Sequence, residues 1–338
     1  MPRVAPEDTE MRAWVLRPEG RESTGALFVV PGLHFLGPED PRMLRFLSAV
    51  AASGVEVFAP FLPTALALKL EPQAADEAAR ALTYALDRPG ARRPGLFTIS
   101  FGSTLGARLA ADPRFADRIG DLMLFGGFCD WRDVLRYSVG GGDTGAPVPA
   151  DPLNQVVIYL NLVDLIAGAP SNTEALKAGW TAFARETWGD VAMKARDRYE
   201  PVAHRLAEAL SEEQRPLFLR GCNAAPGGRA EIDQALDRAT ERLGWLDPTP
   251  HLAKLRGVVH VVHGADDDVI PVTHADALAA ACPNASKVYR RVTGMYGHTG
   301  PEGLAGLVRR GPEALREVGT MVGLLAAIAD VAHPDARR

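Results

Sequence analysis

The chain has 338 residues, of which 47% are hydrophobic and 23% are charged. That is enough to bury a large core, either in one enlarged domain or in a core domain that carries an insertion. The formal net charge of -5 argues against general binding to nucleic acid or to an anionic membrane, because both favour a basic surface.

Three features of the sequence bear on cellular location: the cysteines, the N-terminal stretch and the length of the apolar runs. Cys129, Cys222 and Cys282 lie far apart and form no C-x-x-C pair, so neither a disulfide framework nor a zinc site is expected. The stretch Met1–Glu10 is acidic and has no apolar segment typical of a signal peptide. No apolar run reaches the roughly 20 residues that span a bilayer. We therefore expect a soluble, cytoplasmic protein without a cofactor, a metal or a membrane span.

Strand and helix patterns alternate from the N-terminus to about residue 130. This alternation is typical of an α/β fold with a doubly wound, mostly parallel sheet that is covered by helices on both faces. In chain order the predicted elements are the strands Met11–Leu16 and Ala26–Val30, the helix Pro41–Ala52, the strand Val55–Ala59, the helix Pro72–Leu86, the strand Leu96–Ile99, the helix Gly102–Ala111 and the strand Asp121–Phe125.

The alternation stops after Asp130 and returns near residue 251. Between these points the sequence predicts a loop at Gly140–Gly142 and the helices Asn154–Ile166, Asn172–Trp188, Val191–Leu210 and Ala230–Leu243, closed by the proline-rich Asp247–Pro250. The last part predicts the strand Gly257–Val262, the helix His274–Ala281, the strand Lys287–Val292 and the helix Glu313–Val331. We therefore expect a core made of residues 1–130 and 251–338, with a helical cap made of residues 131–250.

Ser100 follows the predicted strand Leu96–Ile99 and directly precedes a predicted helix that opens with Gly102. A sharp turn between a strand and a helix exposes a serine hydroxyl at the carboxyl edge of the sheet and requires small neighbours. Such a hydroxyl becomes a nucleophile when a base removes its proton, an acid orients that base, and donors stabilise the oxyanion.

The sequence offers a base and an acid beyond two later strands. His298, between Gly297 and Thr299, can serve as the base, and an acidic loop of three aspartates follows the strand Gly257–Val262. The spacing to His263 favours Asp267 over its neighbours as the orienting acid. Asp130, beyond another strand, is the alternative acid, although capping a helix or hydrogen bonding near the site suits it better. The amide of Phe101, at the start of a helix, is expected to stabilise the oxyanion.

Together these residues resemble an α/β-hydrolase-fold serine hydrolase of the esterase and lipase type, with a helical cap. The matching segments are Pro31–Leu33, Ser100–Gly102, His263–Asp267 with Pro271, and Gly297–His298. The resemblance implies that Ser100 is the nucleophile, Asp267 the acid and His298 the base. It also implies that the backbone amides of Leu33 and Phe101 form the oxyanion hole.

Four further positions near these motifs need an interpretation. Thr98 stands where the turn usually has a first glycine, and it fits there if the facing helix is small at that point. Pro31 replaces the usual histidine of the oxyanion loop, which leaves the backbone amide unchanged. His34 is expected to contact the substrate or, more simply, to pack beside the loop. Ser103, about one helical turn after Ser100, is expected to be a buried helix residue.

The sequence therefore predicts a carboxylesterase-like serine hydrolase, most simply of class EC 3.1, acting on a small, partly apolar molecule. The bond cleaved would be a carboxylic ester or a thioester, through an acyl-enzyme on Ser100. A peptidase or an acyltransferase could use the same three residues. An α/β-hydrolase-fold protein without activity, used for binding, is the alternative from another class. The sequence leaves the oligomeric state, the acyl group and the leaving group open.

Overall fold

The central element is an eight-stranded sheet, seen in a computed structural model that describes residues 3–4, 11–140, 146, 148–294 and 312–335. The strands follow the order β1-β2-β4-β3-β5-β6-β7-β8. β1 and β2 run antiparallel to their neighbours, and all the other pairs are parallel. Their bounds are β1 Arg3–Val4, β2 Met11–Leu16, β3 Gly25–Val30, β4 Val55–Pro60, β5 Gly95–Ile99, β6 Leu122–Phe125, β7 Val258–Gly264 and β8 Lys287–Thr293.

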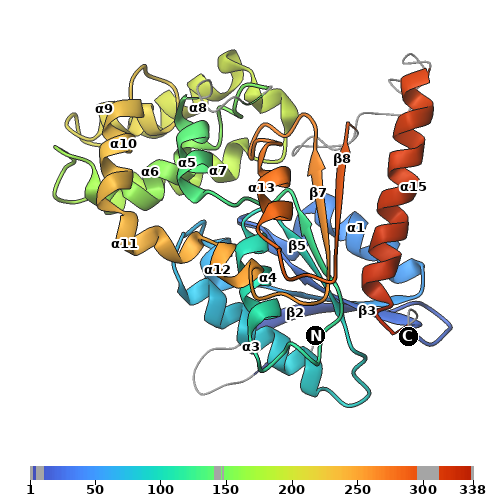
Figure 1. Ribbon diagram of the computed structural model, residues 1–338. Helices are drawn as coiled ribbons and strands as arrows, with labels where there is room; N and C mark the ends of the chain where they lie inside the picture. The colour runs from blue at the N-terminus through green and yellow to red at the C-terminus, as the bar shows by residue number, and fades with distance from the viewer. Residues whose placement is uncertain (1–2, 5–10, 141–145, 147, 295–311, 336–338) are drawn as a thin grey trace.

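Helices cover both faces of this sheet (Figure 1). α1 (Pro41–Ala52) and α15 (Pro312–Ala332) pack on one face, and α3 (Gln73–Asp87), α4 (Gly102–Ala111) and α13 (His274–Ala280) pack on the other. Strand β3 shows why both layers form: Leu27 and Val29 belong to the first core, Phe28 and Val30 to the second, and every residue of the strand is buried. Continuous apolar runs of this kind are typical of parallel strands covered on both sides. The predicted fold class is confirmed.

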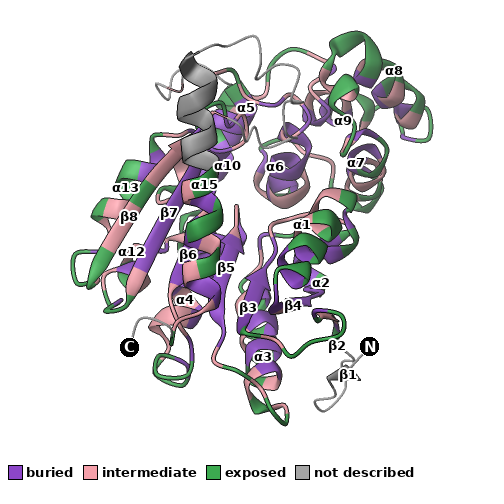
Figure 2. Cartoon of the chain, turned by 90° about the vertical axis from the view of Figure 1, so that its right-hand side faces the viewer, coloured by how far each residue is buried: buried purple, intermediate pink, exposed green. Residues whose placement is uncertain are grey.

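Residues 131–246, which we call the helical insertion, contain no strand among their described residues. Their helices are α5 Trp131–Gly140, α6 Gln155–Leu162, α7 Glu174–Thr187, α8 Arg196–Ala207, α9 Arg215–Gly221, α10 Arg229–Arg238 and α11 Thr240–Leu243, with the 3₁₀ turns η2 Val163–Leu165, η3 Val191–Lys194 and η4 Gly244–Leu246. Figures 1 and 2 place the insertion beyond the carboxyl ends of the parallel strands. It is followed by the short α12 (Thr249–Leu252).

Most predicted elements agree with the structure to within one or two residues. Within the helical insertion, α5 and α9 were not expected, and the helix predicted over Ala230–Leu243 is divided into α10 and α11. The helix predicted over Asn154–Ile166 is α6 followed by η2, and the single helix predicted over Val191–Leu210 is two elements, η3 and α8. Ala195, between them, has an extended backbone with ψ 133°. The short elements β1, α2 (Pro63–Leu66) and η1 (Gly37–Glu39) were also not expected.

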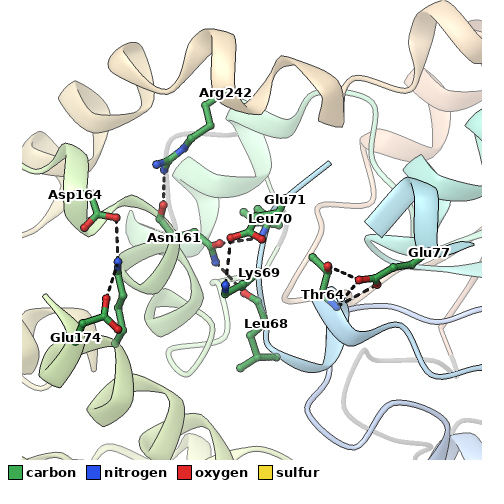
Figure 3. Close-up of polar contacts among 11 residues, drawn as sticks. Thr64, Leu68, Lys69, Leu70, Glu71, Glu77, Asn161, Asp164, Glu174 and Arg242 are labelled. Atoms are coloured by element: carbon green, nitrogen blue, oxygen red, sulfur yellow. Dashed lines mark hydrogen bonds and ion pairs between the residues drawn. The ribbon is translucent and has the colours of Figure 1, made fainter. Parts of the chain in front are cut away.

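Asn161 of α6 joins the insertion to the core (Figure 3). Its side-chain amide donates to the carbonyl oxygen of Leu68 over 2.9 Å and accepts from the N–H of Leu70 over 2.8 Å. Leu68 has φ +58°, a left-handed conformation that is costly for a leucine. Arg242 of α11 holds the backbone carbonyl of Asn161 from the other side. These bonds fix the segment that carries Leu70, which lines the cavity described below.

Glu77 anchors the start of α2 to α3 in the same region (Figure 3). The buried carboxylate accepts from the hydroxyl of Thr64 over 2.7 Å and from its backbone N–H over 3.1 Å. A buried carboxylate is tolerated because these donors replace the water that it loses.

In the described ranges of the chain, no helix is both long and apolar enough to cross a bilayer.

Candidate active site

Ser100 lies at the carboxyl end of β5 with φ +53°, in the left-handed region that is unusual for any residue but glycine. Its N–H donates to the carbonyl of Phe125 over 2.8 Å, and its carbonyl accepts from the N–H of Ser103 over 2.9 Å. These two bonds hold the strained turn between β5 and α4. Backbone strain of this kind is found mainly at functional sites, where the surrounding structure maintains it.

Close backbone packing explains the glycines around this turn. A Cβ added to Gly102 would lie 2.5 Å from the carbonyl oxygen of Pro31, so the start of α4 touches the loop that leaves β3. A Cβ on Gly32 would lie 3.3 Å from Cβ and 3.8 Å from Oγ of Ser100. The loop Pro31–Leu33 therefore passes directly beside the serine hydroxyl, as the sequence predicted for an oxyanion loop.

Thr98 fits two residues before the serine because Gly106 of α4 faces it. A Cβ on Gly106 would lie only 2.1 Å from Cγ2 of Thr98. The Thr98 hydroxyl donates to the carbonyl of Met123 over 2.8 Å and lies 3.2 Å from Oγ of Ser103, which is buried in α4. The expectations for Thr98 and Ser103 are confirmed. A strand that turns into a helix at a left-handed serine has the geometry of the nucleophile elbow of α/β-hydrolase folds. The chain has an α/β-hydrolase fold.

Gly106→Ala should lower the free energy of unfolding by about 2 kcal/mol, because the added methyl group overlaps the Thr98 methyl. In a Thr98→Ser background, which deletes Cγ2 and keeps the hydroxyl, the same change should be neutral or stabilising, since alanine favours helix over glycine by about 1 kcal/mol. Urea denaturation of the two single variants and the double variant measures this coupling. Equal losses in both backgrounds would contradict the proposed contact.

Two backbone amides near Ser100 are free to bind a ligand. Neither the N–H of Leu33 nor that of Phe101 donates to another residue in the described part of the chain. Both residues line the same cavity as Ser100, and Phe101 occupies the N-cap position of α4. Two backbone donors that have no partner among the described residues, beside a strained serine, would suit a negatively charged oxygen.

Asp267 follows β7 and is the buried member of the three consecutive aspartates. Its Oδ1 accepts from the backbone N–H groups of Val269 and Ile270, each over 2.9 Å, and its Oδ2 lies 3.4 Å from Nε2 of His263. Asp267 lines the cavity, whereas Asp266 is exposed. Two backbone donors fix the carboxylate in one orientation, which suits a group that must orient a histidine.

His298 lies outside the described residues, so its position relative to Ser100 stays a prediction. His34 is the histidine that does line the cavity among the described residues. Its Nδ1 accepts from the N–H of Leu36 over 3.2 Å, and its Nε2 lies 3.4 Å from Oδ2 of Asp40. Burial lowers the pKa of His34, and the Asp40 carboxylate opposes this effect. With Nδ1 occupied as an acceptor, neutral His34 carries its proton on Nε2 and has no lone pair for the serine proton.

Asp130, the other residue near the predicted site, has a structural role. Asp130 caps α5: its Oδ1 accepts from the N–H of Arg132 over 2.8 Å and from that of Asp133 over 3.2 Å. It is not among the described residues that line the cavity. His34, in contrast, both lines the cavity and stacks on Phe35, with ring centroids 4.6 Å apart.

The residues described above meet at a cavity of about 550 Å³, within the range of small-molecule sites. Most of its wall is apolar, with contributions from β5, α1, α5, α6 and α15. Its floor holds Ser100, Leu33, Phe101 and Asp267, and its roof comes from the helical insertion, including Trp131, Leu135, Val157, Ile158 and Trp188.

An ion-pair cluster connects the roof to the loop of Asp267. Nζ of Lys194 lies 2.9 Å from Oδ2 of buried Asp151 and forms a second ion pair with Asp268. The N–H of Asp151 also donates to the carbonyl of Asp268 over 2.7 Å. Neither Lys194 nor Asp151 was predicted as a site residue, because the cluster depends on contacts between distant segments, such as the pair of Lys194 with Asp268, 74 residues apart. Two carboxylates share one ammonium group, so the cluster keeps a net negative charge.

Compared with protein-family models and with curated proteins, the sequence gives no match. Many solved structures share the general fold. One is Est1E from Butyrivibrio proteoclasticus, with 12% identity over 96% of this chain and 98% of that chain and a TM-score of 0.47. Another is the enol-lactonase from Burkholderia xenovorans, with 14% identity, coverage of 95% and 100%, and a TM-score of 0.41. A third is an alpha/beta hydrolase fold protein from Nakamurella multipartita, with 19% identity, coverage of 94% and 99%, and a TM-score of 0.40. The fold assignment rests on the sheet and the elbow rather than on these similarities.

Proposed function

We propose that this protein is a carboxylesterase-like serine hydrolase that cleaves a carboxylic ester or a thioester of a small, partly apolar molecule. The observation that carries the proposal is the strained conformation of Ser100, at φ +53°, on the floor of a largely apolar cavity beside two unused backbone amides. This arrangement supports the roles of Ser100 as nucleophile, of the two amides as oxyanion donors and of the cavity as the chamber for an apolar group.

In the proposed reaction, Oγ of Ser100 attacks the carbonyl carbon while His298 takes the hydroxyl proton. The amides of Leu33 and Phe101 donate to the oxyanion, which the N-terminus of α4 also stabilises. The carbon–oxygen or carbon–sulfur bond then breaks, and His298 gives its proton to the leaving group. Water attacks the acyl-enzyme by the same route and regenerates Ser100. Asp267 orients His298 and stabilises its protonated form.

We propose that the helical insertion acts as the cap of this site. Its residues form the roof over Ser100, and their apolar character suits an uncharged acyl or alcohol group. A largely apolar chamber limits the water around the reacting carbonyl and strengthens the interaction of the developing oxyanion with the two amides.

A fluorophosphonate probe tests the proposal, since it reacts with activated serines. We expect the purified protein to incorporate one equivalent of probe, and mass spectrometry to locate the adduct on the peptide that contains Ser100. A panel of p-nitrophenyl esters and acyl thioesters with short to medium chains should show turnover by the same preparation. A folded protein that incorporates no probe and hydrolyses no member of the panel would instead be a binding protein.

The described residues do not favour the alternative of an inactive binding protein. In the sequence, Thr98 was the one feature that favoured an inactive binding protein. The facing Gly106 accommodates its side chain, and the elbow adopts its strained turn. An acyltransferase would use the same residues, and the panel distinguishes it by acyl transfer to added alcohols in preference to water.

A further inference from the structure

The roof of the cavity includes a small set of polar side chains within an apolar surface. Polar groups of this kind, few and fixed in position, usually determine which ligand a pocket accepts. The helical insertion contributes six of them, and the hydrogen-bond partners of each decide which is available to a ligand. They are Ser138, Asp151, Asn154, Thr187, Asp190 and Lys194.

Five of the six are already bonded within the protein. The hydroxyl of Ser138 donates to the carbonyl of Val134 over 3.1 Å, and that of Thr187 donates to the carbonyl of Phe183 over 2.8 Å. Asp190 caps η3 by accepting from the N–H of Ala192 over 2.9 Å. The two hydroxyls are therefore bonded to carbonyl groups of their own helices, as is common for serine and threonine in helix interiors.

The two charged side chains of the roof, Lys194 and Asp151, are also paired within the protein. Lys194 is held between Asp151 and Asp268, and Oδ1 of Asp151 accepts from the N–H of Leu153 over 2.9 Å. Among the described residues of the insertion, the cation that lines the cavity is Lys194, which is already paired, so a carboxylate on a substrate would face Asp151. The roof therefore favours an uncharged polar group over an anionic one.

Asn154 differs from the other five. It occupies the N-cap position of α6, yet its side chain makes no capping hydrogen bond. Its Nδ2 is buried and, within the described chain, has no hydrogen-bond partner. Buried amide groups are almost always hydrogen bonded, and each exception requires an explanation. Asn154 lines the cavity, and a half turn of its amide about the last bond exchanges the positions of the donor and the acceptor.

We propose that Asn154 is a specificity-determining residue that hydrogen bonds an uncharged oxygen of the substrate, away from the bond that is cleaved. The inference deepens the proposed function and rests on it. The substrate class is accordingly an ester or thioester with a largely apolar chain that carries an uncharged ether, carbonyl or hydroxyl oxygen at the position facing the roof. Such an oxygen satisfies the amide of Asn154, and an all-methylene chain leaves it without a partner.

The experiment compares p-nitrophenyl octanoate with a series of esters in which one oxygen replaces a methylene at each position of the acyl chain. Wild type, Asn154→Leu and Thr187→Val are measured after fluorophosphonate titration of their active sites. We expect the preference of the wild type for its best oxygen-containing ester, as a ratio of kcat/KM values, to fall about five- to tenfold in Asn154→Leu. Thr187→Val, which lines the same cavity but bonds its own helix, should keep the wild-type ratio.

The possible results separate this inference from the proposed function. A labelled, active Asn154→Leu variant with wild-type ratios across the series would overturn the role of Asn154 and leave the hydrolase proposal in place. A wild-type protein that neither reacts with the probe nor hydrolyses any ester would overturn both. If Asn154→Leu does not fold, Asn154→Ala removes the same amide with a smaller side chain and should show the same fall.

Discussion

Ser100→Ala should lower kcat for ester hydrolysis by about 10⁴-fold or more and abolish labelling by fluorophosphonates. The reason is that the acyl-enzyme forms on Oγ, and no neighbouring hydroxyl replaces it: Ser103 is buried within α4. Steady-state kinetics at matched protein concentration, with labelling as the second readout, measure the effect. Turnover within tenfold of the wild type would show that the reaction does not use Ser100.

Ser100→Gly provides the matched control for the backbone at this position. Glycine adopts φ +53° without steric cost, whereas serine and alanine do not. We therefore expect Ser100→Gly to be as inactive as Ser100→Ala but at least as stable in urea denaturation. In an ordinary helix or strand the order would be reversed. A clearly less stable glycine variant would contradict the strained turn between β5 and α4.

Asp267→Asn should lower kcat by about 10⁴-fold with little loss of stability. The asparagine retains an oxygen that can accept from the N–H groups of Val269 and Ile270, so the loop keeps its conformation. The amide cannot stabilise a protonated histidine. His298→Ala should lower kcat by a comparable or larger factor. The double variant should have a kcat no lower than that of the less active single variant, because both changes remove the same proton transfer.

Asp266→Asn is the control for the acidic loop. Asp266 is exposed and adjacent in sequence, so its replacement should leave kcat within about twofold of the wild type, as is usual for a surface substitution. A large loss in Asp266→Asn together with an active Asp267→Asn would show that the acid has been assigned to the wrong residue. Circular dichroism of each variant verifies that the fold is intact.

The sequence by itself determined the order of strands and helices in the core. Strands such as β3 are continuous apolar runs, and α1 begins at a proline after Asp40, whose side chain accepts from the N–H groups of Arg42 and Met43. Signals of this kind depend on neighbouring residues, so they are visible in a single chain. The elbow was predictable for the same reason, since Ser100 and Gly102 adjoin both a strand and a helix.

The helical insertion was predicted less well because its boundaries depend on contacts between distant segments. The pattern over Val191–Leu210 favoured one helix, but the chain is extended at Ala195, between η3, whose Lys194 pairs with Asp151 and Asp268, and α8. Periodicity of apolar residues contains no information about an ion pair with a residue 74 positions away.

Tertiary structure alone decided which groups face the cavity. Three consecutive aspartates are equivalent in composition, and only the fold buries Asp267, exposes Asp266 and pairs Asp268 with Lys194. Likewise, Thr98 is compatible with the elbow because Gly106 lies opposite it, and Asn154 stands out because its Nδ2 has no partner among the described residues. Local sequence sets the conformation of each segment, but burial and hydrogen-bond pairing arise only when distant segments pack together.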